Sequence, residues 1–571
     1  MPNAITFSER WKLMQLNLMH QAIGLYKFVT YNPLRRLSPM GSAAEELFIA
    51  PQDISTTDPT RASDLYEGYY SLRGYTVNCS GQSPFDIKGQ PQKWEEALHE
   101  FGWLKHLRAA ETSVSRIQAR TLVEDWLRAH GSLHGMTATP LIMSKRVIAW
   151  LSHSPLLLQD CDHKFYQRFI RSLSKQVRIL RSTHNDTPAG MSRMYTSIAL
   201  AYASVCMGND EKSIRSGLKR LDHELTNQIL PDGGHISRNP SNLIIIMSML
   251  MPLRQAIISR DVVPSDIMIG AIDRMMPMLR FFRLGDGTFA KFNGMGQTPI
   301  DLVSTMLAFD DAKGTPVLNA QHSGYQRLEA GRAVLIMDAG ALPPQNVSGD
   351  MHAGCLSFEL SDGADRMIVN CGSANNINLQ DDHSISAIAR STAAHTTLSI
   401  NEMSSSRFLP EQKYKHLAGV PVLSGPSDVQ SKRDFKQGYT MVAAEHDGYV
   451  AYLNVRHRRE IWLDSVGTTL TGRDTLLDRN GEAVSQNNNH TFQLRFHLDS
   501  NVAAQASSNH TIDIKLPSGQ RWLFTCESHP VELTDTINIS DVYGTKPAFQ
   551  ILLQGQLSNT SVLNWTFQRL S

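Results

Sequence analysis

Apolar residues recur at helical spacing through the middle of the chain. Trp94, Ala97, Leu98 and Phe101 begin a run with the spacing i, i+3, i+4, i+7 that continues to Leu107 and predicts an amphipathic helix. Further helices are expected at 112–130, 140–153, 163–183, 192–207, 211–230, 240–260 and 265–283. So many helices with short connections predict antiparallel hairpins, arranged as a bundle, a solenoid or a toroid.

The pattern changes to alternation after about Gly314. Leu356, Phe358 and Leu360 alternate with polar or small residues, and Asp362-Gly363 then predicts the turn of a β-hairpin. Further strands are expected at 396–400, 439–454, 459–471, 491–498, 511–516, 520–526 and 548–555. These strands predict an antiparallel β-sandwich.

Three parts follow from these patterns. Residues 1–90 form an N-terminal extension, in which the Tyr- and Gly-rich stretch 64–76 favours a short hairpin. Residues 91–313 form the helical domain and residues 314–571 the β-sandwich. The expected fold class is therefore α+β with several domains.

Composition and charge narrow the range of possible functions. Hydrophobic residues make up 41% of the chain, which fits a globular protein, and 55 basic against 54 acidic residues exclude a general nucleic-acid binder. The 6 cysteines are scattered without a C-x-x-C pair, so neither a disulfide framework nor a cysteine zinc site is expected. The longest apolar run, 243–253, falls short of the roughly 20 residues that span a bilayer, so no membrane span is expected. No secretory signal is recognised, which makes the cytoplasm the default location, and nothing indicates an oligomeric state.

The first candidate site is the loop Pro231-Asp232-Gly233-Gly234-His235-Ile236-Ser237-Arg238-Asn239-Pro240 between two expected helices. His235 is a candidate for proton transfer, and the guanidinium of Arg238 suits a carboxylate. Asn239 is a candidate substrate ligand, or it is the N-cap of the next helix with Pro240 at the first position.

A second loop, residues 285–296, contains Phe292 and Asn293. Phe292 is suited to stack on a sugar, and Asn293 to donate a hydrogen bond to it. The alternative is a helix that ends at a glycine and is followed by a plain link.

The third group lies in the β-rich part. His352, Asn370 and His395 are candidate ligands of zinc or another divalent cation, and Arg390 lies near His395. The alternative is a set of hydrogen-bonded histidines at an interface.

A fourth group contains Tyr449 and the basic run Arg456-His457-Arg458-Arg459. Arg458 would attract an acidic polysaccharide and Tyr449 would donate a proton. The alternative is a strand edge protected by charge.

The rim loop, the His352-Ala353-Gly354 strand start and the Arg390-Ser391-Thr392-Ala393-Ala394-His395 segment resemble the heparinase II/III-like polysaccharide lyases. The resemblance extends from about Ser63 onward. It implies an incomplete α/α toroid followed by an antiparallel β-sandwich, with a cleft for a uronic-acid polysaccharide that is cleaved by β-elimination. It also implies that His352 is the histidine of the β-domain and that His395 belongs to a metal-linked segment.

Three positions depart from the family pattern. Asn370 stands where relatives often have an Asp ligand, Met191-Ser192 where they have an Asn or His that neutralises the carboxylate, and Asn242 where they have the catalytic Tyr. A displaced tyrosine, Tyr195 or Tyr449, is one replacement.

The sequence therefore leaves three functions to compare. The first expectation is a lyase of an acidic polysaccharide, with His235 or His352 as the base and Tyr449 as the acid. The alternative is a non-catalytic glycan-binding or envelope-biogenesis protein on the same fold. The family resemblance also implies the periplasm or cell envelope as a location other than the cytoplasm. A glycoside hydrolase that uses Asp232 and Asp286 ranks third.

Overall fold

The structure is a computed structural model of the whole chain. It describes residues 7–30, 46–79, 81–309, 314–373, 383–409, 422–436, 438–484, 489–540, 544–558 and 560–570. Residues 310–313, where the expected boundary between the two large domains falls, lie outside this set.

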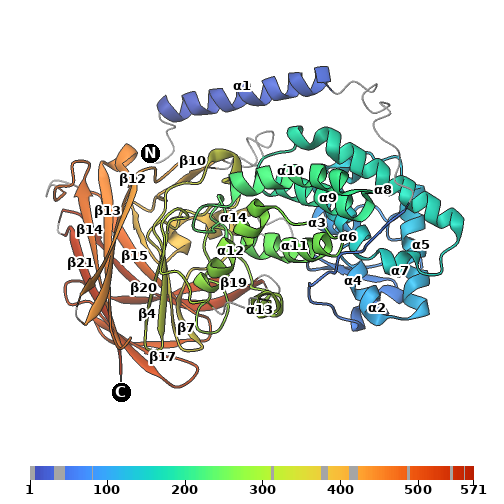
Figure 1. Cartoon of the computed structure of the whole chain (residues 1–571). Helices are drawn as coiled ribbons and strands as arrows, with labels where there is room; N and C mark the ends of the chain where they lie inside the picture. Colours follow the sequence, from blue (N-terminus) through green and yellow to red (C-terminus); the bar gives the residue numbers. More distant parts are fainter. Residues whose placement is uncertain are drawn as a thin grey trace.

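Helices dominate the chain as far as residue 308. They are α1 (Phe7–Thr30), α2 (Thr60–Tyr66), α3 (Gln92–Glu100), α4 (Leu104–Ala110), α5 (Ser113–His130), α6 (Pro140–Ser152), α7 (Ser154–Leu158), α8 (His163–Thr183), α9 (Met191–Met207), α10 (Glu211–Gln228), α11 (Pro240–Ile258), α12 (Asp266–Phe281) and α13 (Ile300–Ala308). Apart from α1, these helices pack around one hydrophobic core and form the helical half seen in Figure 1.

Most of the expected helices are confirmed, but the first run is broken. Phe101 takes a left-handed backbone conformation with φ of 62° and separates α3 from α4. Its ring stays buried and packs against Trp103, Trp126 and Trp150. The apolar spacing therefore continues across the break because the side chains on both sides of it face one core.

Strands dominate the rest of the chain. They are β3 (Asn319–Ala320), β4 (Tyr325–Ala330), β5 (Ala333–Asp338), β6 (Phe358–Asp362), β7 (Asp365–Val369), β8 (Leu398–Ile400), β9 (Arg407–Phe408), β10 (Val422–Ser424), β11 (Val429–Lys436), β12 (Tyr439–Tyr449), β13 (Val455–Asp464), β14 (Thr469–Asp478), β15 (Thr491–Leu498), β16 (Ala503–Ser508), β17 (Thr511–Lys515), β18 (Arg521–Thr525), β19 (Glu532–Ser540), β20 (Gly544–Gln556) and β21 (Val562–Arg569). Two short helices, α14 (His383–Arg390) and α15 (Val450–Leu453), lie among them.

Two large antiparallel sheets face each other. One has the order β11-β12-β13-β14-β21-β18-β17-β16, and the other β19-β20-β15-β7-β6-β5-β4-β3 with β8 added to β15. Their inner faces share one core, in which the Phe358 and Trp565 rings stack with centroids 5.8 Å apart. The expected α+β fold, a helical toroid followed by a β-sandwich, is confirmed.

The strand expected at 459–471 is wrong in its extent. The structure has two strands there, β13 and β14, which pair with each other. The connecting turn contains Gly467 with φ of 76°, and Asp464 accepts hydrogen bonds from the backbone and hydroxyl of Thr468. Leu463 and Leu470 are both buried, so the apolar residues on the two sides of the turn resemble one continuous strand.

A buried ionic network fastens β13 to β14 inside the sandwich. Asp474 and Arg459 are both fully buried, and Arg459 Nε lies 2.8 Å from Asp474 Oδ1. His457 Nε2 lies 2.6 Å from the same oxygen, and Trp565 Nε1 donates to the other at 2.8 Å. Arg459 also donates to the carbonyls of Leu356 and Thr396, so this charge pair contacts the segments that lead into β6 and β8 of the other sheet.

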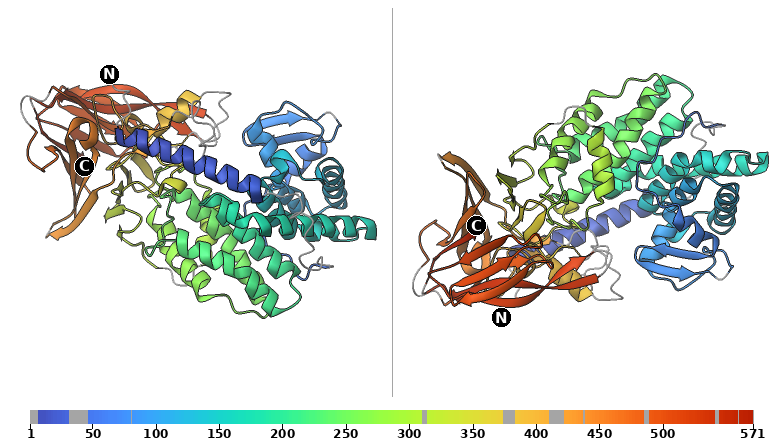
Figure 2. Two further views of the ribbon diagram at one scale, coloured as in Figure 1. Left: turned by 90° about the horizontal axis from the view of Figure 1, so that it is seen from above. Right: turned by 90° about the horizontal axis from the view of Figure 1, so that it is seen from below.

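Two further elements lie beside the packed helices. A hairpin of β1 (Tyr69–Leu72) and β2 (Tyr75–Asn78) covers one end of the helical half. Helix α1 crosses above the molecule from the sandwich towards the helical half, as Figures 1 and 2 show.

Among the described residues, one helix, α11, is long enough and apolar enough to cross a membrane, judged by its length and composition alone. Most of this helix is buried in the helical core.

Candidate functional site

The rim loop joins α10 to α11 at the sandwich-facing side of the helical half. Asn239 caps α11, because its side-chain oxygen accepts from Ser241 N at 2.9 Å, and Pro240 occupies the first turn. This confirms the capping interpretation of the sequence. Gly233 has φ of 87° and lies against Arg274 O, where a Cβ atom would come within 1.9 Å, so the turn requires glycine.

The loop meets segments of the sandwich that are far away in the sequence. We call these residues the junction cluster: Arg238, Asn239, Asn293, Tyr325, Asp338, Asp350, His352 and His395. Asn293 lies at its centre and donates to Tyr325 Oη at 2.7 Å and to Asp338 Oδ2 at 3.0 Å. Its side-chain oxygen accepts from His352 N at 3.3 Å. The loop 285–296 therefore contacts both Asp338, which pairs with Arg238, and His352.

Arg238 is the most heavily bonded member of the cluster. It is buried, has a left-handed backbone with φ of 63°, and forms an ion pair with Asp338. Its remaining N–H groups donate to the carbonyls of Ser323 (2.8 Å), Gly340 (3.0 Å), Ala341 (3.0 Å) and Gly324 (3.2 Å). A guanidinium has five N–H donors, and here all of them bind oxygen atoms of the protein itself.

His235 is held as a neutral imidazole inside the same loop. Its Nε2 lies 3.1 Å from Gln228 Oε1 and its Nδ1 lies 2.7 Å from Ser237 Oγ. Asn242 donates to Ser237 Oγ at 2.8 Å. Burial lowers the pKa of His235 to about 3, so the side chain stays uncharged at neutral pH.

His352 and His395 form a pair on the sandwich side. His352 Nδ1 lies 3.2 Å from His395 Nε2, and His395 Nδ1 lies 2.7 Å from the Ser391 carbonyl, to which it donates. Burial lowers the pKa of His395 to about 4, and burial together with His395 and Arg390 holds the pKa of His352 well below its usual value. Two neutral imidazoles therefore share one hydrogen bond here.

This pair does not fit a zinc centre as it stands. The lone pair of His395 Nε2 that a metal would need accepts the hydrogen bond of His352. The oxygen of the third expected ligand, Asn370, accepts from Thr396 N at 3.0 Å. Across the part of the chain that the structure describes, no group of three or more His, Cys, Asp or Glu residues is placed to hold a metal. A divalent cation stays a prediction of the sequence.

The other candidate residues lie apart from one another. Tyr449 is buried in the sandwich and donates to the Leu398 carbonyl at 2.9 Å, and burial raises the pKa of its phenol. Arg458 lies on β13 with its side chain 45% exposed and is paired with Glu460. Arg390 donates to the Met351 carbonyl at 3.0 Å, beside His352 in the sequence.

Three members of the cluster were missed from the sequence. Asp338 ends the apolar strand β5, Tyr325 begins β4, and Asp350 accepts from Asn239 Nδ2 at 3.1 Å. A carboxylate at the end of a wholly apolar strand is an unusual position for an acidic side chain and was the one available signal for Asp338.

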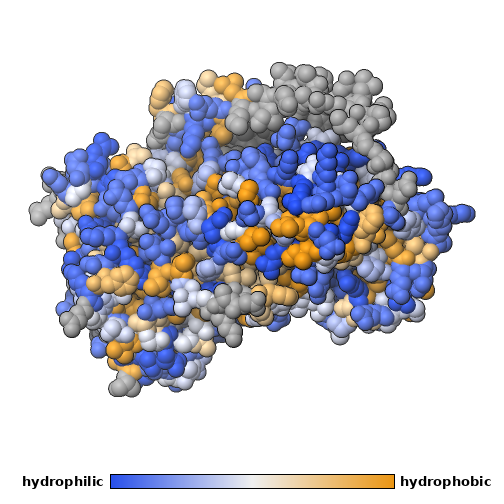
Figure 3. Space-filling model, viewed as in Figure 1, coloured by the Kyte–Doolittle hydropathy of each residue, from blue (hydrophilic) through white to orange (hydrophobic). Residues whose placement is uncertain are grey.

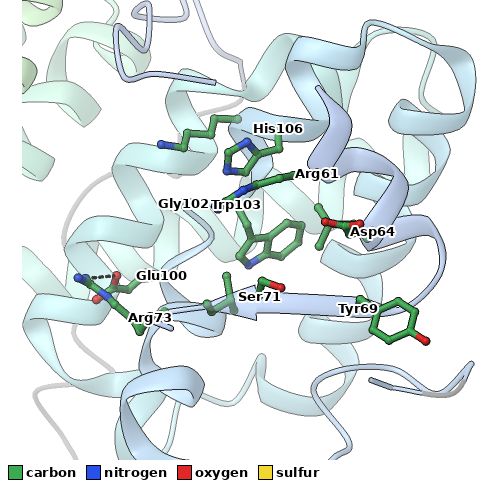
Figure 4. Close-up of a pocket in the computed structure, with 13 residues that line it drawn as sticks. Arg61, Asp64, Tyr69, Ser71, Arg73, Glu100, Gly102, Trp103 and His106 are labelled. Carbon is green, nitrogen blue, oxygen red and sulfur yellow. Dashed lines mark ion pairs between the residues drawn. The ribbon is translucent and has the colours of Figure 1, made fainter. Parts of the chain in front are cut away.

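Two pockets lie in the helical half. The outer pocket, with a volume of about 430 Å³, lies between the β1–β2 hairpin, α2 and α4, and Figure 4 shows Arg61, His106 and Trp103 around it. Asp58 N donates to His106 Nδ1 at 3.1 Å, and burial lowers the pKa of His106 to about 4. The pocket lining therefore combines cationic side chains and a neutral imidazole with the carboxylates of Asp64 and Glu100.

The inner pocket, with a volume of about 230 Å³, lies beside it along α6, α9 and α11. Arg73, Glu100 and Gly102 line both pockets, and the ion pair between Arg73 and Glu100 is visible in Figure 4. Lys145 Nζ lies 2.7 Å from Glu100 Oε1 and 5.2 Å from the ring centre of Tyr195. Burial raises the pKa of Tyr195, although Lys145 opposes this shift.

Comparisons with known proteins agree with this architecture. Residues 312–566 match the family model described as heparinase II/III-like, C-terminal. The chain is 28% identical over 520 residues to FtsZ-localized protein C of Caulobacter vibrioides (strain NA1000 / CB15N), covering 90% of this chain and 88% of that protein.

Solved structures show the same fold. The crystal structure of heparinase III superposes with a TM-score of 0.69 at 14% identity, covering 98% of this chain and 91% of that chain. A mutant of the heparan sulfate lyase HepC from Pedobacter heparinus gives 0.61 at 12% identity, covering 98% and 91%. Residues 312–566 thus match the heparinase II/III-like C-terminal family, and the chain as a whole has the fold of heparinase III.

Proposed function

We propose that this chain is a non-catalytic protein of the heparinase III fold that works by binding at the cell-division machinery. The observation that carries the non-catalytic part is the set of hydrogen bonds around Arg238. A residue that neutralises a sugar carboxylate needs free N–H groups that face the substrate, whereas the N–H groups of Arg238 bind Asp338 and four backbone carbonyls.

The other junction residues support the same proposal. A general base must present a lone pair to the substrate, and both ring nitrogens of His235 have partners inside the protein. The hydroxyl of Tyr449 donates to a backbone carbonyl in the sandwich core. The polar groups of these residues therefore bond within the protein, as expected for a contact that holds two domains together.

The division-site part rests on the relative from Caulobacter, whose name states that it is localised with FtsZ. That relative is similar along 90% of this chain, so the similarity includes both the helical half and the sandwich. Heparinase III shares the fold at 14% identity, a level at which the chemistry of a site does not follow from the architecture.

Sedimentation with FtsZ polymers tests the binding part. The full chain is expected to pellet with FtsZ assembled with GTP and to stay in the supernatant when FtsZ is kept unassembled with GDP. Chain that stays in solution in both cases, together with a fluorescent fusion that spreads evenly through dividing cells, would remove the division-site proposal.

The second candidate is the lyase. It is favoured by the inner pocket, where Tyr195 and the cation of Lys145 lie together beside open space. A cation next to a uronate carboxylate would acidify the sugar proton, and a phenolate would remove it. The lyase requires an unsaturated uronate product that is lost in Tyr195→Phe, whereas the non-catalytic proposal requires that no such product forms.

A further inference from the structure

Helix α1 has two apolar faces, and one of them is exposed to solvent. Leu13 and Leu16 face inward and pack with Leu409 and Leu423. On the opposite side, Phe7, Trp11, Met14 and Leu18 are 84%, 56%, 60% and 53% exposed. Their spacing of i, i+4, i+7 and i+11 places them in one line along the helix, and we call this line the outer stripe.

The inward face fixes the orientation of the helix. Glu9 is buried, with its carboxylate 3.2 Å from Arg407 Nη1, and it accepts from Ser424 Oγ at 2.6 Å. Lys12 Nζ donates to the Leu423 carbonyl at 2.8 Å. Because these contacts all lie on one side, the outer stripe is held pointing away from the body of the protein.

Charge distinguishes among the partners that the stripe would suit. Glu9 is the one acidic residue in the sequence of α1, and its charge is turned inward onto Arg407. The sequence of the helix contains the basic residues Arg10, Lys12 and Lys27; Arg10 is exposed, whereas Lys12 bonds inward to the Leu423 carbonyl. Trp, Phe and Leu on one face with Arg and Lys nearby are typical of a helix that lies in the interface of an anionic bilayer.

A second copy of the chain suits the stripe less well. Stable protein interfaces use about 20–30 residues on each side. The outer stripe offers four side chains on a single helix. A membrane needs no complementary shape, and it gains from each apolar side chain that leaves water.

We propose that α1 docks the protein onto an anionic membrane surface, with the outer stripe inserted among the lipid headgroups and the inward face still bound to the sandwich. Figures 1 and 3 show α1 along one outer side of the molecule, with apolar residues on its described part, so the chain would lie flat on the bilayer. This docking involves no membrane-spanning segment. It also stands independently of the FtsZ proposal, because it rests on α1 alone.

Vesicle sedimentation of the full chain tests the docking. The wild-type chain is expected to pellet with vesicles of mixed phosphatidylglycerol and phosphatidylcholine and much less with phosphatidylcholine alone. Trp11→Ala/Leu18→Ala is expected to weaken binding by at least about tenfold, which corresponds to about 1.4 kcal/mol. The matched control Gln15→Ala/Gln21→Ala changes two exposed polar residues of the same helix and is expected to bind like wild type.

Fluorescence gives a second readout, because Trp11 is the exposed tryptophan among the 8 in the chain. Lipids with brominated tails are expected to quench its emission on binding. Trp11→Phe keeps an apolar ring at this position, so it is expected to bind vesicles without this quenching.

Three results would each overturn the proposal. In the first, the wild-type chain stays in the supernatant with anionic vesicles. In the second, the stripe variant pellets to the same extent as wild type. In the third, the wild-type chain is a dimer and the stripe variant is a monomer. Circular dichroism of each variant checks that the fold is retained. Failure of this test would leave the FtsZ sedimentation result unaffected, so the two proposals are separable.

Discussion

Replacing Arg238 by alanine is expected to lower the free energy of unfolding by about 3–5 kcal/mol. The substitution leaves the buried Asp338 carboxylate without its counter-ion and removes the donors for four backbone carbonyls. Urea unfolding followed by circular dichroism measures the loss as a lower midpoint at constant slope. An arginine that served to hold a substrate would give little change in this experiment.

Two further variants make this result specific. Arg458→Ala removes an arginine that is 45% exposed and paired at the surface with Glu460, so it is expected to cost no more than about 1 kcal/mol. Arg238→Met/Asp338→Leu removes both buried charges together and is expected to recover much of the loss. Wild-type stability in Arg238→Ala would show that the junction does not depend on this pair.

Replacing Asp474 by asparagine is expected to cost a similar amount, about 3–5 kcal/mol. Arg459 would be left as a fully buried charge whose remaining partners are carbonyls and whose ion pair is gone. Thermal unfolding measures the loss as a lower Tm. The matched control is Asp513→Asn, which breaks a partly exposed pair with Arg521 and should stay within about 1 kcal/mol of wild type.

The same carboxylate predicts a pH dependence. Burial alone would raise the pKa of Asp474, but the charge of Arg459 and the hydrogen bond with His457 outweigh it and hold the pKa below the usual value. A lowered folded-state pKa means that the contribution is complete above the unfolded value of about 3.9 and is lost as the pH falls below it. Wild type should therefore lose stability on acidification below roughly pH 4 more steeply than Asp474→Asn. Parallel curves would contradict this assignment.

The elements of the fold were predictable because their side chains repeat with a regular period. The helices at 140–153, 163–183 and 211–230 and the strands at 491–498 and 511–516 follow from apolar spacing. The break at Phe101 and the turn at Gly467 were missed because the buried residues on either side of them keep that spacing.

The convergence of the rim loop with the sandwich segments was expected from the resemblance, but the way they are joined was not. Arg238 binds mostly backbone carbonyls, and every residue type carries a carbonyl, so the sequence holds no signal for this set of contacts. Gly340 gives room for it, since a Cβ atom there would lie 2.4 Å from Arg238 Nη2. That requirement appears only when the two domains are placed together.

The burial of Tyr449 also needed the three-dimensional arrangement. The residue ends β12 next to a basic run, a position that suits a strand edge as well as a site. In the folded chain its ring belongs to the core between the sheets and its hydroxyl reaches β8. Apolar contacts of the ring and hydrogen bonds of the hydroxyl to the backbone carbonyls of Leu398 and Met403 make it a core residue in this structure.

Release of unsaturated uronate is the measurement that tests most directly whether the heparinase fold is here a binding scaffold. The full chain, incubated with heparan sulfate and other uronic-acid polysaccharides at concentrations at which heparinase III gives rapid product, is expected to produce no rise in ultraviolet absorbance. A rise that grows in proportion to the chain and is lost in His352→Ala or Tyr195→Phe would contradict the non-catalytic proposal and establish the lyase in its place.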